Sequence, residues 1–104
     1  RAPARSLLVQ FDASRLADYL RMATEIRRGG LAVELFPEPK KLGQQLKYAD
    51  RQGFRLAVIA GSQEFEASMV KVKNLKTGET IDVPTSDGGA ALVTALRDAL
   101  AAGD

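Results

Sequence analysis

The stretch LAVELFPEPKKLGQQLKYADRQGFRLAVIAGS, residues 31–62, decides the fold because two apolar runs flank a helical pattern within it. Residues 31–36 form the first run, which Pro37 and Pro39 end because proline cannot donate a ladder hydrogen bond. Residues 54–60 form the second run. Two apolar strands joined through a helix by short connections predict a parallel crossover unit.

The helix between these strands is predicted over residues 40–52. Leu42, Leu46 and Ala49 recur there at offsets 0, 4 and 7, which places them on one helix face. Gly53 follows directly and is a typical stop, since glycine readily takes the left-handed conformation that ends a helix.

A similar pattern precedes this unit. Residues 7–11 form a buried strand, and Asp12 or Ser14 can cap a helix that runs to Gly29 and Gly30. The apolar stripe predicted for this helix consists of Leu16, Leu20 and Ala23, with Arg27 at its edge and Tyr19 and Ile26 beside it. The order up to residue 60 is therefore β-α-β-α-β.

A hairpin and a last helix complete the chain. Residues 62–68 suit a short helical turn, residues 69–75 and 80–83 form two strands around a turn at 76–79, and residues 88–101 form the last helix. The expected face of that helix is Leu92, Leu96 and Leu100. We therefore predict a three-layer α/β fold around a mixed five-stranded sheet.

Composition limits the chemistry that the chain can perform. The 104 residues suffice for one domain, which we expect over 1–104. The chain lacks cysteine and histidine, which excludes disulfides, Cys/His zinc sites and Ser-His-Asp catalysis. No signal peptide or membrane-length apolar segment occurs, and the absence of cysteine fits a reducing cytoplasm. The opening RAPARS lacks an initiator Met, which suggests a fragment of a longer protein.

No pattern predicts an active site. Gly61 and Ser62 follow a strand, where open α/β sheets bind ligands, but no phosphate-binding glycine motif accompanies them. Glu64 and Glu66 are two residues apart and would not share a helix face. Metal-binding loop spacing is absent as well. A small flavodoxin-like enzyme is therefore a poor interpretation.

The strand MVKVK, residues 69–73, has an apolar and a basic face. Because side chains alternate in a strand, Lys71 and Lys73 share one face about 7 Å apart. Such a face either binds an anionic partner or protects a solvated edge strand from aggregation. The alternation itself leaves both possibilities open.

Several ordered phrases resemble a known family. KKLGQQLKYAD (residues 40–50), Gly61, Glu64 and VKVKNLKTGE (residues 70–79) resemble the C-terminal anticodon-binding domain of class IIa aminoacyl-tRNA synthetases, most closely the histidyl-tRNA synthetases. The resemblance covers essentially the whole chain. It implies a mixed five-stranded sheet, the anticodon loop of a tRNA as partner, and a catalytic domain elsewhere in the parent chain. ATP and Mg²⁺ would act in that catalytic domain, and no cofactor is expected here.

The resemblance also implies which residues contact the anticodon. By position, Glu64 and Lys73 match the pair that reads bases in such domains, although related synthetases often carry Arg where this chain has Lys73. Asn74 offers a bidentate amide, and Lys71 is expected to contact the RNA backbone. Unstacked anticodon bases expose their edges, and a carboxylate can accept from the N1–H and N2–H of guanine.

The resemblance leaves two further expectations. The fragment is expected to be a monomer, and its parent a homodimer. The alternative function is a synthetase-derived interaction or regulatory domain that no longer reads an anticodon.

Overall fold

The computed structural model describes residues 5–102, so the first residues of RAPARS and both ends of the predicted domain lie outside the described residues. The described part contains β1 (Ser6–Leu8), the 3-10 turn η1 (Ala13–Arg15), α1 (Leu16–Arg28), β2 (Val33–Leu35), α2 (Leu42–Gln52), β3 (Leu56–Ile59), α3 (Ser62–Glu66), β4 (Met69–Asn74), β5 (Thr80–Pro84) and α4 (Ala90–Ala102). The predicted order of elements is confirmed. No helix in residues 5–102 is long and apolar enough to cross a membrane.

The strands form one mixed sheet with the order β2-β1-β3-β4-β5. β1 pairs in parallel with β2 and with β3, as expected for strands joined by crossover helices. β4 runs antiparallel to both β3 and β5. Val83 lies opposite Val70, and Ile81 lies opposite Val72, so the predicted hairpin is present and its valines and isoleucine are paired across the two strands.

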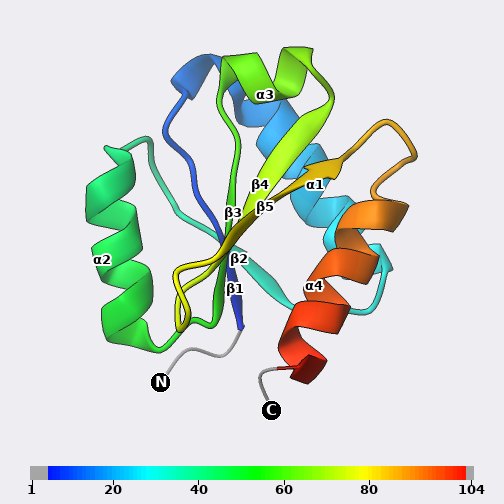
Figure 1. The fold of residues 1–104 in the computed structure, drawn as a ribbon. Coiled ribbons are helices and arrows are strands. Elements are labelled where there is room, and N and C mark those ends of the chain that lie inside the picture. Colours follow the sequence, from blue (N-terminus) through cyan, green and yellow to red (C-terminus); the bar gives the residue numbers. More distant parts are fainter. Residues whose placement is uncertain (1–4, 103–104) are drawn as a thin grey trace.

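Helices cover the sheet on both faces and give the predicted three layers. Figure 1 shows α2 on one face of the sheet and α1 with α4 on the other. The larger core cluster lies beneath α1 and α4 and includes Leu8, Ile26, Val58, Val70 and Leu92. The smaller cluster lies beneath α2 and includes Leu7, Val9, Ala49, Phe54 and Ile59.

The buried face of α1 differs from the predicted stripe. Leu16 and Leu20 were expected to face the core, but their side chains are 46% and 51% exposed. The residues that α1 buries are Tyr19, Met22, Ala23 and Ile26. The helix is turned because the Tyr19 hydroxyl donates a hydrogen bond of 2.6 Å to the carbonyl oxygen of Ala60, which draws this ring beneath the end of β3.

The face of α2 follows the prediction but also contains a buried polar residue. Ala49 is buried, and Leu42 and Leu46 pack against the cluster around it. The Gln45 amide is fully buried, accepts from the backbone N–H of Gln10 at 2.8 Å and donates to the Gln10 carbonyl at 2.6 Å. Both polar ends of this side chain are satisfied, so α2 is fixed to the chain that leaves β1.

The last helix begins two residues later than predicted. Gly88 and Gly89 adopt φ angles of +74° and +93°, which a right-handed helix cannot include. The Asp87 carboxylate instead accepts hydrogen bonds from the backbone N–H groups of Gly89 and Ala91 and thereby caps α4. Leu92 and Leu96 are buried as predicted, and Leu100 packs against the core at its edge.

Gly43 in α2 and Gly53 at its end provide a matched test of where this helix ends. Gly53 ends the helix at φ +82°, whereas Gly43 lies inside it, and added Cβ atoms would meet nothing within 4 Å at either position. We expect Gly53→Ala to lower the free energy of unfolding by about 1 kcal/mol, because it forces an L-residue into the left-handed region. Gly43→Ala should raise it by about 0.5 kcal/mol by favouring the helix. Urea denaturation measures both, and equal effects would contradict the assigned end of α2.

Candidate nucleic-acid interface

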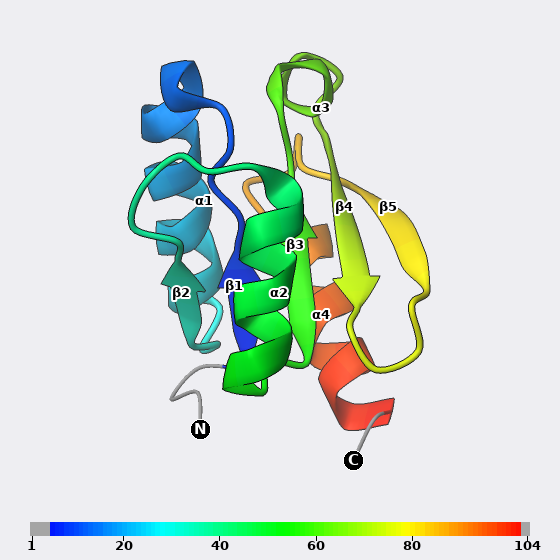
Figure 2. The ribbon, with the colours of Figure 1, turned by 90° about the vertical axis from the view of Figure 1, so that its left-hand side faces the viewer.

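The basic side chains of β4 point to the sheet face that carries α2. Val70 and Val72 are buried beneath α1 and α4, so Lys71 and Lys73 point to the opposite face. Figure 2 shows α2 lying over the centre of the sheet while β4 and β5 extend beyond it. The surface beside α2, called the open β4–β5 face here, consists of Lys71, Lys73, Thr80 and Asp82.

Lys71 is held by an acid on the neighbouring strand. Its Nζ lies 2.9 Å from Oδ1 of Asp82, directly opposite in β5. The hydrogen bond and the charge of Asp82 raise the pKa of Lys71, and Glu64 adds a smaller contribution. Both side chains are about half exposed, at 47% and 59%, so a phosphate that binds Lys71 has to compete with a solvated carboxylate.

Lys73 has a different environment. It is half-buried and lies opposite Thr80 in β5 and Ala57 in β3, neither of which carries a charge. Within residues 5–102, Lys73 forms no ion pair or hydrogen bond through its ammonium group. Its charge is therefore the one on the open β4–β5 face that an external anion can engage without displacing a partner.

Glu64 lies in α3, which directly precedes β4. Its Oε1 accepts a hydrogen bond of 2.7 Å from the backbone N–H of Gly61. Gly61 is the N-cap and has no side chain, so Glu64 itself satisfies this helix end. The carboxylate is half-buried and fixed in direction by this bond, while Oε2 has no hydrogen-bond partner within residues 5–102. The free oxygen is available to a donor from outside.

Asn74 lies at the other end of β4 and shapes the hairpin turn. Its Oδ1 accepts hydrogen bonds from the backbone N–H groups of Lys76 at 2.9 Å and Thr77 at 3.0 Å. This arrangement is typical of asparagine in turns. The structure therefore brings Glu64 close to Lys71 but does not bring Asn74 to the same place. Base recognition by Asn74 stays a prediction that requires both turn bonds to be replaced.

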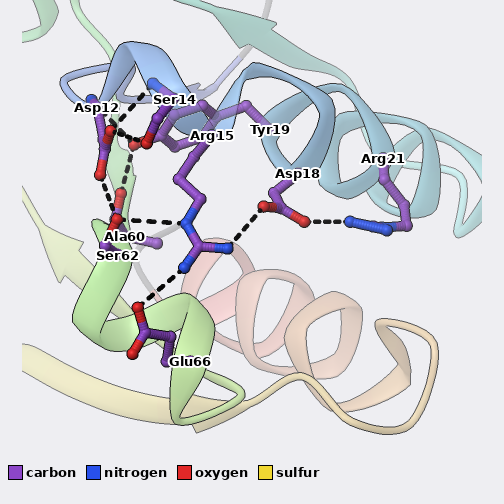
Figure 3. Close-up of polar contacts among 9 residues, drawn as sticks. All are labelled: Asp12, Ser14, Arg15, Asp18, Tyr19, Arg21, Ala60, Ser62 and Glu66. Atoms are coloured by element: carbon purple, nitrogen blue, oxygen red, sulfur yellow. Dashed lines mark hydrogen bonds and ion pairs between the residues drawn. The ribbon is translucent and has the colours of Figure 1, made fainter.

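A polar network joins the chain after β1 to the chain after β3 (Figure 3). The Asp12 carboxylate accepts from the Ser14 N–H at 3.1 Å and from the Ser62 hydroxyl at 2.5 Å. Hydrogen bonds from Ser14 and then Ser62 lower the pKa of Asp12, and the nearby Arg15 charge adds to the effect. Asp12, one of the two predicted cap residues, thus caps η1 instead of α1 itself, and it also holds the start of α3.

Arg15 extends this network along α3. Its Nε lies 3.3 Å from the Ser62 hydroxyl, and its Nη2 lies 3.1 Å from Oε2 of Glu66. Nη1 contacts Asp18, which also pairs with Arg21. The guanidinium carbon lies 5.6 Å from the centre of the Phe65 ring, within range of a cation–π contact.

These contacts fill the crevice at the carboxyl ends of β1 and β3, where open α/β sheets bind ligands. A Cβ atom at Gly61 would lie 2.9 Å from the Phe11 ring, so an aromatic side chain packs directly on the backbone there. Tyr19 and Ser62 occupy the same region through their bonds to Ala60 and Asp12. Gly61 and Ser62 thus form a closely packed exit from β3.

Two aromatic side chains, Phe65 and Tyr48, have partners inside the domain. Phe65 meets Tyr19 edge to face with ring centres 5.1 Å apart. Tyr48 meets Phe36 edge to face at 5.2 Å and donates a hydrogen bond of 2.7 Å to Glu34. Both rings are used in packing.

The sequence did not reveal the Asp12 and Arg15 network. Asp12 is predicted as a possible helix cap, but its bond to Ser62 spans 50 residues, and that of Arg15 to Glu66 spans 51. Local periodicity carries no signal over such separations. The one available signal is topological, because parallel strands place their carboxyl ends at the same edge of a sheet.

Comparisons with known proteins agree with the resemblance seen in the sequence. The family model described as "Anticodon binding domain" matches residues 8–94. A histidine–tRNA ligase of Rhodopirellula baltica is 52% identical over 90 residues, which cover 86% of this chain and 20% of that protein. A histidine–tRNA ligase of Xanthomonas campestris is 38% identical over 96 residues, which cover 92% of this chain and 20% of the relative. The chain thus spans about one fifth of these relatives.

Solved structures share the fold. A histidyl-tRNA synthetase from Nostoc sp. PCC 7120 superimposes with a TM-score of 0.87 at 31% identity, covering 95% of this chain and 23% of that chain. A prolyl-tRNA synthetase from Cryptosporidium parvum superimposes with a TM-score of 0.81 at 15% identity, covering 97% of this chain and 23% of that chain, which is a likeness of fold alone. With a family model matching most of its length and this architecture, the chain belongs to the anticodon-binding domain family.

Proposed function

We propose that this chain is the anticodon-reading module of a histidine–tRNA ligase. The observation that carries the proposal is the open β4–β5 face of a member of the anticodon-binding family. There the Lys73 ammonium has no partner within residues 5–102, and Glu64 presents a fixed carboxylate beside Lys71. The relatives named histidine–tRNA ligase support the amino-acid assignment. The parent's catalytic domain would charge the tRNA with ATP and Mg²⁺.

Each side chain has a distinct task in this proposal. Glu64 accepts hydrogen bonds from the Watson–Crick edge of an unstacked guanine through its free oxygen, while its other oxygen stays on the Gly61 N–H. Lys73 attracts a phosphate or a base oxygen as a point charge, because an ammonium lacks the planar fork of arginine. Lys71 contributes less because Asp82 holds its ammonium.

The charges on this surface also set the expected affinity. Two lysines face two carboxylates, Asp82 and Glu64, so the surface attracts an RNA backbone only weakly. Discrimination among bases then rests on directional hydrogen bonds. The domain should therefore contribute more to anticodon choice than to total tRNA affinity.

The first test concerns the cation. Lys73→Ala should weaken binding of every anticodon stem-loop by a similar factor and reduce the slope of log affinity against log salt by about 0.7, the value for one phosphate of a single strand. Fluorescence anisotropy with a labelled histidine anticodon stem-loop at several salt concentrations measures this. Arg28→Ala is the matched control, because it removes one exposed charge at the end of α1, on the other face of the sheet. An equal slope change in both variants would contradict a localised contact at Lys73.

The second test concerns the base reader. Glu64→Gln keeps an acceptor for the Gly61 N–H but loses the charge, so it should reduce discrimination between the histidine anticodon and one with its guanines replaced by about tenfold. Asp98→Asn, on the exposed side of α4, is the charge-matched control. Unchanged discrimination in Glu64→Gln would show that another residue reads the base. Equal affinity of the unmodified chain for both loops would favour the alternative, an interaction domain that no longer reads an anticodon.

A further inference from the structure

α3 is too short to be stable without contacts to the rest of the domain. It contains five residues, and isolated helices below about 12 residues are unstable in water. Its N-cap is a glycine, so among the described residues 5–102 the side-chain cap at this end comes from Glu64 within the helix. The orientation of Glu64 must therefore be set by what α3 packs against.

One side chain of the neighbouring layer contacts α3 at three of its five residues. Arg15 bonds to the hydroxyl of Ser62, forms an ion pair with Glu66 and lies over the Phe65 ring. Glu64 is between these contacts in sequence and bonds instead to the backbone of Gly61. Figure 3 shows the Arg15 guanidinium reaching across from the start of α1 to both ends of α3.

The environment of Arg15 makes it suited to positioning. Its side chain is 26% exposed, and its planar fork bonds Ser62, Asp18 and Glu66 in different directions at once. The ion pair with Glu66, which is 72% exposed, contributes little by itself. The position of α3 is fixed by the combination of these contacts. A lysine could not make all of them at once, because its ammonium lacks the planar fork.

Arg15 lies away from the two lysines of the open β4–β5 face. It belongs to the layer of α1, whereas Lys71 and Lys73 point to the opposite face of the sheet. An effect of Arg15 on RNA recognition is therefore expected through α3, which it contacts, and not through either lysine.

We infer that Arg15 is a positioning residue for anticodon discrimination: by fixing α3 through Ser62, Phe65 and Glu66, it aims the Glu64 carboxylate at the base. This inference rests on the proposed function and deepens it, because it assigns specificity to a residue that does not touch the RNA.

The test compares Arg15→Gln with Arg21→Gln. Both variants remove one charge and one partner of Asp18, Arg15 just before α1 and Arg21 within it, but of the two only Arg15 bonds to α3. Arg15→Gln should reduce discrimination between histidine and guanine-replaced anticodon stem-loops by about threefold to tenfold, the size of couplings within one hydrogen-bonded network. The salt slope should stay unchanged, and Arg21→Gln should leave both readouts unchanged. Arg15→Lys should behave like Arg15→Gln, because charge without the fork cannot restore the geometry.

A double-mutant cycle identifies the path. In the Glu64→Gln background, Arg15→Gln should produce no further loss of discrimination, because the reader it aims is already removed. An equal loss in both backgrounds, no loss in either, or a lower salt slope would overturn the inference while leaving base reading by Glu64 intact. If the unmodified chain does not discriminate, the proposed function fails and the inference falls with it.

Circular dichroism and the thermal midpoint of each variant separate positioning from unfolding. If Arg15→Gln unfolds, Ser62→Ala is used instead, since it removes only the hydroxyl that Arg15 and Asp12 share. Ser62→Ala should also lower discrimination while the chain remains folded. Intact discrimination in this variant would overturn the inference.

Discussion

The Asp12 carboxylate joins two chain segments on which the rest of the structure depends. One oxygen caps η1 at the start of α1, and the other accepts from Ser62 at the start of α3. The Tyr19 hydroxyl closes the same junction by donating to Ala60. These bonds become possible because β1 and β3 are parallel neighbours whose carboxyl ends meet at one edge of the sheet. The direction of α3, and with it that of Glu64, follows from this junction.

The packing of this junction bears on where the domain could bind a ligand. Side chains of α1 and α3 occupy the crevice that α/β enzymes use for nucleotides. Beyond α2, the hairpin carries lysines on the open β4–β5 face and valines toward the core. A flat, partly charged strand surface suits unstacked bases better than a small metabolite, which requires a concave apolar pocket.

The sequence predicted the order of elements well because apolar periodicity follows burial directly. The crossover units, the hairpin register and the caps at Asp12 and Gly53 were all readable from local patterns. The buried face of α1 was only partly readable, because both Tyr19 and Leu20 can pack in a core. The hydrogen bond to the distant Ala60 carbonyl decides that Tyr19 is the buried one. The pairing of Lys71 with Asp82 likewise depends on a contact across the hairpin. The turn bonds of Asn74 are local and typical of asparagine, so the residue type at this position does indicate them.

The central claim is that RNA binds the open β4–β5 face beside α3. Amide chemical shifts, followed by NMR while a histidine anticodon stem-loop is added to the chain, test this claim most directly. The account predicts that the largest changes fall on residues 61–66 and on β4 and β5, with little change along α4. Changes centred on α1 and α4, with residues 61–74 unaffected, would contradict it.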